Sequence, residues 1–233
     1  MKELLKKYFN KYGISADDDK LNKFCEYYNI VIEENQKFNL TAITEKNDFA
    51  LKHFLDCVIP ASLIKDGAKL LDIGAGAGFP SIPLKILRPD LNITMIDSLN
   101  KRVNFLNETV QKLNMSNISA IHIRAEDYAA KNREQFDVVI ARAVAGLNTL
   151  SEYCLPFVKI GGVFIAMKGS SYRQELDEAN GAINILGGRL KDIKLTQIDE
   201  MDGERVNIVI KKVKETPAKY PRGKNLPRLK PIE

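Results

Sequence analysis

Cysteine, histidine and long apolar runs are all scarce in this sequence of 233 residues. Its three cysteines, Cys25, Cys57 and Cys154, are widely separated and fall in apolar helical patterns, which predicts buried, reduced thiols and not metal ligands or nucleophiles. The two histidines, His53 and His122, also lie in apolar patterns, and we expect structural roles for both. Since no apolar run is long enough to cross a bilayer and no early segment resembles a signal peptide, we expect a cytoplasmic protein without metal or membrane contact.

Basic residues are absent from the most informative segment, where Lys and Arg are missing between Leu70 and Leu84. An apolar strand there leads through Asp72 into the turn Gly74-Ala75-Gly76-Ala77-Gly78, and a helix follows. Glycines allow a positive φ and a close ligand approach, and such strand-to-helix turns bind nucleotide-like ligands in open α/β sheets. Phe79 stands where a dinucleotide motif has its third glycine. The pattern favours S-adenosylmethionine, which is cationic and free of phosphate, with Asp72, Gly74, Gly76, Gly78 and Phe79 as candidate cofactor-binding residues.

Further acidic residues follow later predicted strands. Asp97 ends an apolar run about twenty residues beyond the glycine turn, where a carboxylate bonds ribose hydroxyls in mononucleotide-binding units. Ala125, Glu126 and Asp127 follow a third run, residues 118–123. A helix N-cap is the alternative for Asp127. Because successive parallel strands end at one edge of a sheet, these acids predict one elongated binding site along that edge.

The hydrophobic pattern divides the chain into three parts. Residues 1–65 show helical periodicity, residues 66–213 alternate short strands with helices, and residues 214–233 form a basic, proline-rich tail. We predict an α/β fold with the Rossmann-like sheet of class I S-adenosylmethionine-dependent methyltransferases, in which five parallel strands are followed by an antiparallel hairpin through Asp202-Gly203. The predicted strands are 69–73, 92–97, 118–123, 136–142, 161–167, 189–197 and 205–212, and the predicted helices of this domain are 81–87, 99–114, 147–158 and 171–187.

Basic residues concentrate in the tail and at the predicted ligand edge. The formal net charge is +5, of which the tail contributes most, and its four prolines predict an extended, non-helical segment. The tail is either a solvated disordered segment or an arm that follows the phosphates of a polyanion. Arg142 and Lys168 end the fourth and fifth strands, where an acceptor would lie. The candidate RNA-binding residues are Lys101, Arg102, Arg124, Lys168, Lys219 and Arg222.

Two sequence features that are missing restrict which base atom could accept the methyl group. The sequence after the fourth strand, Ala141-Arg142-Ala143-Val144, is not the Asn/Asp-Pro-Pro-aromatic element common in amino-group methylation of bases. No cysteine lies near a strand end, which argues against C5-pyrimidine methylation. Guanine N7 is already nucleophilic at neutral pH, so its methylation needs positioning but no obligatory general base.

Taken together, these motifs resemble the RsmG family, also called glucose-inhibited division protein B, the bacterial 16S ribosomal RNA guanine-N7 methyltransferases. The most specific elements are Gly78-Phe79-Pro80-Ser81-Ile82-Pro83, in which Ser81 replaces a common Gly, and Asp97-Ser98-Leu99-Asn100-Lys101-Arg102. The resemblance covers nearly the whole chain and includes residues 39–43, 53–56, 72–83, 97–102, 124–126, 141–143, 167–169 and 219–222.

The resemblance implies S-adenosylmethionine contacts at Gly74, Phe79, Ala125, Glu126 and Arg142, with Asp97 at the ribose. It also implies one guanine of 16S rRNA as target, in the small ribosomal subunit or its assembly intermediate, and we expect a monomer. Arg142 is the candidate catalytic residue. Two alternatives remain at this point: a methyltransferase acting on a small molecule, which would not need the basic tail, and a non-catalytic RNA-binding protein with the same fold.

Overall fold

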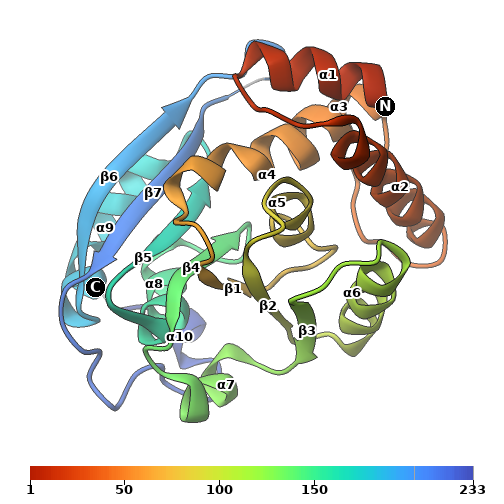
Figure 1. Ribbon diagram of the computed structural model, residues 1–233. Helices are drawn as coiled ribbons and strands as arrows, with labels where there is room; N and C mark the ends of the chain where they lie inside the picture. Colours follow the sequence, from red (N-terminus) through yellow and green to blue (C-terminus); the bar gives the residue numbers. More distant parts are fainter. Residues whose placement is uncertain (202, 233) are drawn as a thin grey trace.

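The computed structural model describes residues 1–201 and 203–232. Its centre is a seven-stranded sheet in the order β3-β2-β1-β4-β5-β7-β6 (Figure 1). The first five strands pair in parallel, and β7 is antiparallel to both β5 and β6. The strands are β1 Lys69–Ile73, β2 Asn92–Asp97, β3 Ile118–His122, β4 Phe136–Arg142, β5 Val158–Lys168, β6 Gly188–Thr196 and β7 Arg205–Lys212.

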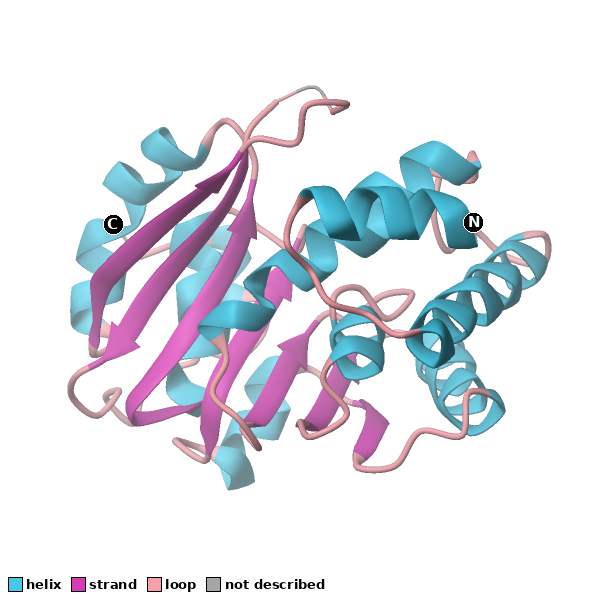
Figure 2. Cartoon of the chain, turned by 45° about the horizontal axis from the view of Figure 1, so that its top comes forward, coloured by secondary structure: helices cyan, strands magenta, loops and turns pink. Residues whose placement is uncertain are grey.

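Helices cover both faces of this sheet, because alternate strand residues point to opposite sides and both sides are apolar (Figure 2). Leu70 and Ile140 face the N-terminal helices, whereas Leu71 and Val139 face the C-terminal ones. The first group comprises α1 Lys2–Lys11, α2 Asp18–Asn35, α3 Lys46–Phe49, the π-helix η1 Ala50–Leu55, α4 Asp56–Val58, the 3-10 helix η2 Ile59–Leu63, α5 Ser81–Leu87 and α6 Asn100–Lys112. The second comprises α7 Ala125–Asn132, α8 Leu147–Cys154, the 3-10 helix η3 Leu155–Phe157, α9 Tyr172–Ile185 and α10 Leu226–Leu229.

The predicted methyltransferase variant of the sheet is confirmed, including the antiparallel hairpin at its edge. Asp202, assigned to the hairpin turn, lies outside the described residues. Three local differences have physical causes. The acidic stretch at residues 125–127 begins a helix, α7, that was too short and polar to show clear periodicity. The predicted helix 147–158 ends early because Pro156 follows α8, and β5 then starts at Val158.

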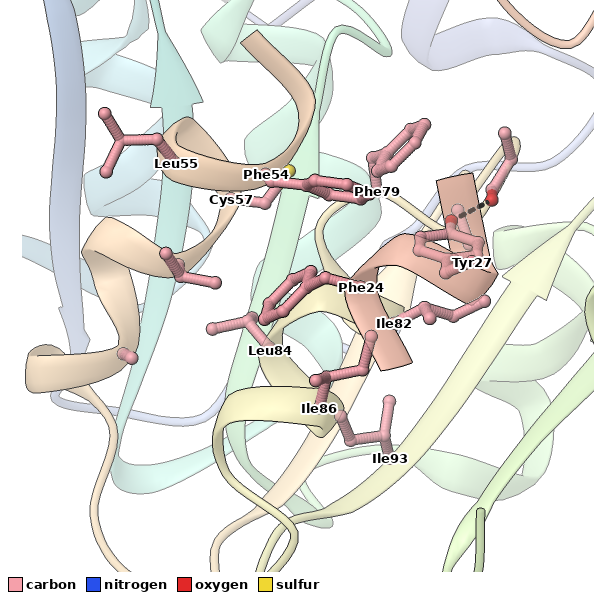
Figure 3. Packing of buried hydrophobic residues seen from close by; sticks show 14 of the residues in the cluster. Phe24, Tyr27, Phe54, Leu55, Cys57, Phe79, Ile82, Leu84, Ile86 and Ile93 are labelled. Carbon is pink, nitrogen blue, oxygen red and sulfur yellow. Dashed lines mark hydrogen bonds between the residues drawn. The ribbon is translucent and has the colours of Figure 1, made fainter. Parts of the chain in front are cut away.

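The N-terminal segment is one packed layer and not a separate unit. Its aromatic side chains join the core that covers the sheet, with Phe24 against Phe54 at a ring-centroid distance of 5.0 Å. Figure 3 shows Phe24, Tyr27 and Phe79 in this cluster. Cys57 and Cys154 are buried thiols, as predicted, whereas Cys25 is partly exposed. The layer therefore reaches the same sheet edge as the glycine turn.

Candidate active site

The strand order reverses between β1 and β4, and the loops that follow these two strands meet at that point. Open α/β sheets bind ligands at such a switch point, beyond the carboxyl ends of the strands. Gly74, after β1, has a φ of +72°. A Cβ atom at Gly74 would lie 2.8 Å from Cγ2 of Val144, in the loop after β4. The absence of a side chain at Gly74 thus lets the two loops touch.

Two cavities adjoin the loop after β4, and both are lined by Ala143 and Val144. The first, which we call the cofactor cavity, has a volume of about 470 Å³. It is lined by residues that end β1, β2 and β3, by the start of α7 and by the tail: Ile73, Gly74, Ile96, Asp97, Ser98, Arg102, Ile123, Arg124, Ala125, Glu126, Tyr153, Asn225 and Arg228. Of the acidic residues predicted to lie along one sheet edge, Asp97 and Glu126 therefore line a single cavity.

The carboxylate of Asp97 ties the glycine turn to the end of β2. One oxygen accepts from the backbone N–H of Gly76 at 3.0 Å, and the other accepts from the N–H of Leu99 at 2.9 Å. The guanidinium of Arg102 lies 3.6 Å from the same carboxylate. Each oxygen keeps acceptor capacity toward the cavity. Asp97 can therefore hold the turn and bind a hydroxyl group at once.

Gly76 and Gly78 have different surroundings although both adopt a positive φ. A Cβ at Gly76 would meet nothing closer than 3.9 Å, so this glycine leaves the turn open. A Cβ at Gly78 would lie 2.7 Å from the hydroxyl of Tyr27, which donates a hydrogen bond to the carbonyl of Ala77 (Figure 3). Gly78 therefore allows packing of the turn against α2 and lies behind the cavity.

Asp72 and Phe79 also lie behind the cavity wall and line neither cavity. Asp72 is completely buried, its carboxylate oxygens have no hydrogen-bond partner among the described residues, and burial raises its pKa to about 7. The ring of Phe79 packs between Tyr27, Phe49 and His53. Cofactor contact by these two side chains stays a prediction, and their observed role is to support the turn from beneath.

The second cavity, which we call the acceptor cavity, has a volume of about 710 Å³ and is bordered by four cationic side chains, Lys52, Arg142, Lys168 and Arg205. The carboxylates Asp56 and Glu175 also line it. Lys168 donates to Glu175 at 2.6 Å and to the carbonyl of Ala145 at 2.7 Å. The surplus of positive charge suits an anionic or electron-rich acceptor.

Arg142 is fixed at the boundary of this cavity by the N-terminal layer. Its guanidinium donates to the carbonyl of Lys52 at 2.7 Å, to Asp56 at 3.1 Å and to Nδ1 of His53 at 3.0 Å. It also lies over the ring of Phe79, with 5.4 Å between Cζ and the ring centroid. Three of its partners come from η1 and α4, so the π-helical turn positions Arg142.

His53 lines the acceptor cavity, and its contacts hold Arg142 in place. Burial, with a smaller contribution from the positive charge of Arg142, lowers the pKa of His53 to about 3, so the ring is neutral. Its Nδ1 accepts from Arg142, and Nε2 therefore carries the proton and donates to Thr41 Oγ1 at 2.7 Å. The ring stacks on Phe79 with centroids 4.2 Å apart. These contacts leave Arg142 little freedom to move.

The candidate RNA-binding residues are not equivalent in the structure. Lys101, Arg124 and Lys219 are exposed, and Arg124 borders the cofactor cavity. Lys168 is engaged within the protein, as described above. Arg222 forms a double hydrogen-bonded ion pair with Glu152, whose side chain is completely buried. The structure therefore shows an anchoring contact at Arg222, and RNA contact at this residue stays a prediction.

The tail also differs from the extended, non-helical arm that its prolines predict. It packs against the domain and contains the short helix α10, with Pro227 in its first turn, where proline is tolerated. Arg133 donates to the carbonyls of Thr216 and Tyr220. We call residues 214–232 the C-terminal strap. The sequence of this segment indicates its charge and its proline content. It does not indicate that Arg222 pairs with the buried side chain of Glu152.

Gly74→Ala should disturb the contact between the two loops. A methyl group there would overlap Val144 and would have to adopt a positive φ, and the two effects together should lower the free energy of unfolding by about 2 kcal/mol. Val144→Ala removes the overlap. Chemical denaturation of both single variants and the double variant measures this: the double variant should be more stable than the sum of the single effects predicts, whereas strict additivity would contradict the contact.

In the part of the chain that the structure describes, no cluster of three or more His, Cys, Asp or Glu side chains is arranged to hold a metal ion. Nor do residues 1–201 and 203–232 contain a helix with the length and apolarity to cross a membrane.

The sequence matches the family model "GidB: rRNA small subunit methyltransferase G" over residues 20–202. "Ribosomal RNA small subunit methyltransferase G" of Clostridium tetani is 45% identical over 99% of this chain and 98% of its own length. The protein of the same name from Desulforamulus reducens is 52% identical over 90% of this chain and 89% of its own. Among solved structures, M. jannaschii TYW2 in complex with AdoMet shares the fold, with a TM-score of 0.59 and 16% identity over 75% of this chain and 81% of that one.

Proposed function

This chain belongs to the rRNA small subunit methyltransferase G family, and we propose that it transfers a methyl group from S-adenosylmethionine to N7 of one guanine in 16S rRNA. The observation that carries this proposal is the pair of cavities that share Ala143 and Val144 as lining residues. One cavity is suited to the cofactor and the other to the base. Their common wall puts a donor and an acceptor within reach of each other.

The cofactor cavity fits S-adenosylmethionine by its donor set. Gly74 lines the cavity at the end of β1, and Asp97 presents a carboxylate at the end of β2. Ala125 and Glu126 lie at the start of α7, on the far side of Asp97 from the turn along the sheet edge. S-adenosylmethionine bound there would supply an activated methyl group on a sulfonium. Asp97 would bind the ribose, and the Gly74 end of the cavity would hold the methionine part nearest Val144.

The acceptor cavity would hold the guanine and its flanking phosphates. Arg142 is fixed by three hydrogen bonds and can offer its remaining N–H groups to the base. Lys52 and Arg205 border the cavity from η1 and β7 and would contact the RNA backbone. Neutral His53 keeps Arg142 in place and donates its only N–H to Thr41.

Methyl transfer to guanine N7 requires mainly that the two reactants are correctly positioned. Guanine N7 carries an in-plane lone pair that is free at neutral pH, so no side chain has to remove a proton before attack. Holding the two reactants in line accounts for a large part of catalysis in such a reaction. The fixed guanidinium of Arg142 and the close contact of the loops after β1 and β4 provide that rigidity.

We further propose that the protein acts in the cytoplasm as a monomer, on the small ribosomal subunit or on an assembly intermediate. Exposed Lys101, Arg124 and Lys219 would contribute phosphate contacts outside the cavities.

The decisive experiment is nucleoside mass spectrometry of 16S rRNA from small subunits of a strain lacking the gene, before and after incubation with protein and S-adenosylmethionine. We expect one equivalent of 7-methylguanosine to appear. No methylated nucleoside despite measurable S-adenosylmethionine binding would contradict the RNA substrate and favour a small-molecule enzyme. Failure to bind S-adenosylmethionine as well would leave a non-catalytic RNA-binding protein.

A further inference from the structure

We propose that the C-terminal strap completes the cofactor cavity and that Arg228 is a positioning residue, which holds the wall between the two cavities through the backbone of Val144. This inference rests on the proposed function, since it assigns a role in S-adenosylmethionine binding. Asn225 and Arg228 line the cofactor cavity although they follow Tyr153, the nearest other lining residue in the sequence, by 72 and 75 residues.

The wall between the cavities is the short loop of residues 143–146, which joins β4 to α8. Ala143 adopts a φ of +56°, a left-handed conformation that costs a non-glycine residue energy. Two cations hold the loop from opposite sides. Nη2 of Arg228 donates to the carbonyl of Val144 at 2.9 Å, and Nζ of Lys168 donates to the carbonyl of Ala145 at 2.7 Å.

The position of Val144 matters because its side chain lies directly against the glycine turn. A Cβ at Gly74 would lie 2.8 Å from Val144 Cγ2, so a small shift of this loop changes the shape of the cavity at Gly74. Arg228 thus acts on the cofactor side of the wall, and Lys168 on the acceptor side. The fixed loop sets the separation of the two reactants.

The strap is anchored firmly enough to fix Arg228. Arg222 pairs with buried Glu152 through its side chain and its backbone N–H. Five residues further along, the carbonyl of Pro227 accepts from Thr149 Oγ1 at 2.9 Å, and Pro227 itself is buried. Thr149 and Glu152, which bind the strap, both lie on α8, the helix that follows the loop between the cavities. The strap and the loop are therefore attached to the same element.

The test compares S-adenosylmethionine affinity of the full-length wild type, Arg228→Ala, Arg228→Lys and Lys230→Ala by isothermal titration calorimetry. Lys230 is the matched control, because it is an exposed strap cation whose ammonium contacts no described residue. Arg228→Ala should bind about tenfold more weakly, as loss of a charge-assisted hydrogen bond predicts. Arg228→Lys should keep more of the affinity than Arg228→Ala, since its ammonium is only one bond short of Nη2 and can still donate to the Val144 carbonyl. Melting temperatures of the unliganded variants check that each one folds.

The outcomes separate the inference from the proposed function. If the wild type itself does not bind S-adenosylmethionine, the proposed function fails. If the wild type binds and Arg228→Ala binds equally well, only the role of Arg228 is overturned. Arg228→Lys as weak as Arg228→Ala would also overturn it, because a donor kept at this position would then add no affinity. A raised KM for rRNA at unchanged cofactor affinity would make Arg228 an RNA contact instead.

Discussion

Arg142→Ala should reduce methyl transfer to rRNA by about 10²–10³-fold while the protein still folds. The substitution removes the one guanidinium that is fixed at the border of the acceptor cavity, and loss of a preorganised donor of this kind typically costs that much in rate. The loss should appear mainly in single-turnover transfer at saturating S-adenosylmethionine. Wild-type turnover by the variant would remove Arg142 from the site.

A structural effect of the same substitution has to be separated from the catalytic one. Arg142 is also the ion-pair partner of Asp56, whose side chain is only 13% exposed and whose pKa is raised by burial. Asp56→Ala breaks the same ion pair but leaves the guanidinium with His53 and the carbonyl of Lys52. We expect both variants to lose comparable melting temperature and Asp56→Ala to retain far more activity. Equal losses of activity would mean that Arg142 acts only as a clamp between the helical layer and the sheet.

Most strands could be predicted to within a few residues, because the hydrophobic periodicity and the turn residues at the ends of each apolar run indicate the same boundaries. β1, β2 and β4 begin and end where the apolar runs do. The boundaries were less accurate where a single residue decides them. Pro156 ends the helical turn after α8, and short α7 offered only two turns of sequence to recognise.

The cofactor cavity was predictable in part, where its residues belong to local motifs. Gly74, Asp97, Ala125 and Glu126 line it, whereas the other predicted cofactor-binding residues do not: Asp72, Gly76, Gly78 and Phe79 line neither cavity, and Arg142 lines the acceptor cavity. The acceptor cavity was predictable only at Arg142 and Lys168, since its other cations come from the N-terminal layer and β7. The apolar pattern around His53 does not predict its stacking contact with Phe79. That contact depends on how the N-terminal layer packs on the glycine turn.

The tail shows the limit of composition most clearly. A run rich in Lys, Arg and Pro satisfies the criteria for a disordered basic arm, yet its anchoring depends on one buried carboxylate far away in sequence. Glu152 lies in an amphipathic helix where an acid is normally on the solvated face, and its complete burial could not be inferred without Arg222 opposite it. Basic residues in such a tail are therefore of two kinds, anchors and exposed contacts.

Arg222→Ala should be among the most destabilising single substitutions in this protein, with a loss of about 3–5 kcal/mol in the free energy of unfolding. Glu152 accepts three hydrogen bonds within 2.9 Å from Arg222, and the variant would keep only the one from the backbone N–H. The buried carboxylate would then lack its counter-charge. For a chain of this size, that loss lowers the melting temperature by about 10 °C.

Two companion variants decide whether this loss reflects an orphaned charge. Lys219→Ala removes an exposed cation from the same strap and should leave the melting temperature nearly unchanged. Arg222→Ala combined with Glu152→Leu should recover part of the stability, because removing both charges leaves no unpaired group in the core. If Arg222→Ala instead melts like the wild type and binds rRNA more weakly, Arg222 is an RNA contact and the ion pair is incidental. The structure favours the first result, since a guanidinium already satisfied by a buried carboxylate has little to gain from a phosphate in water.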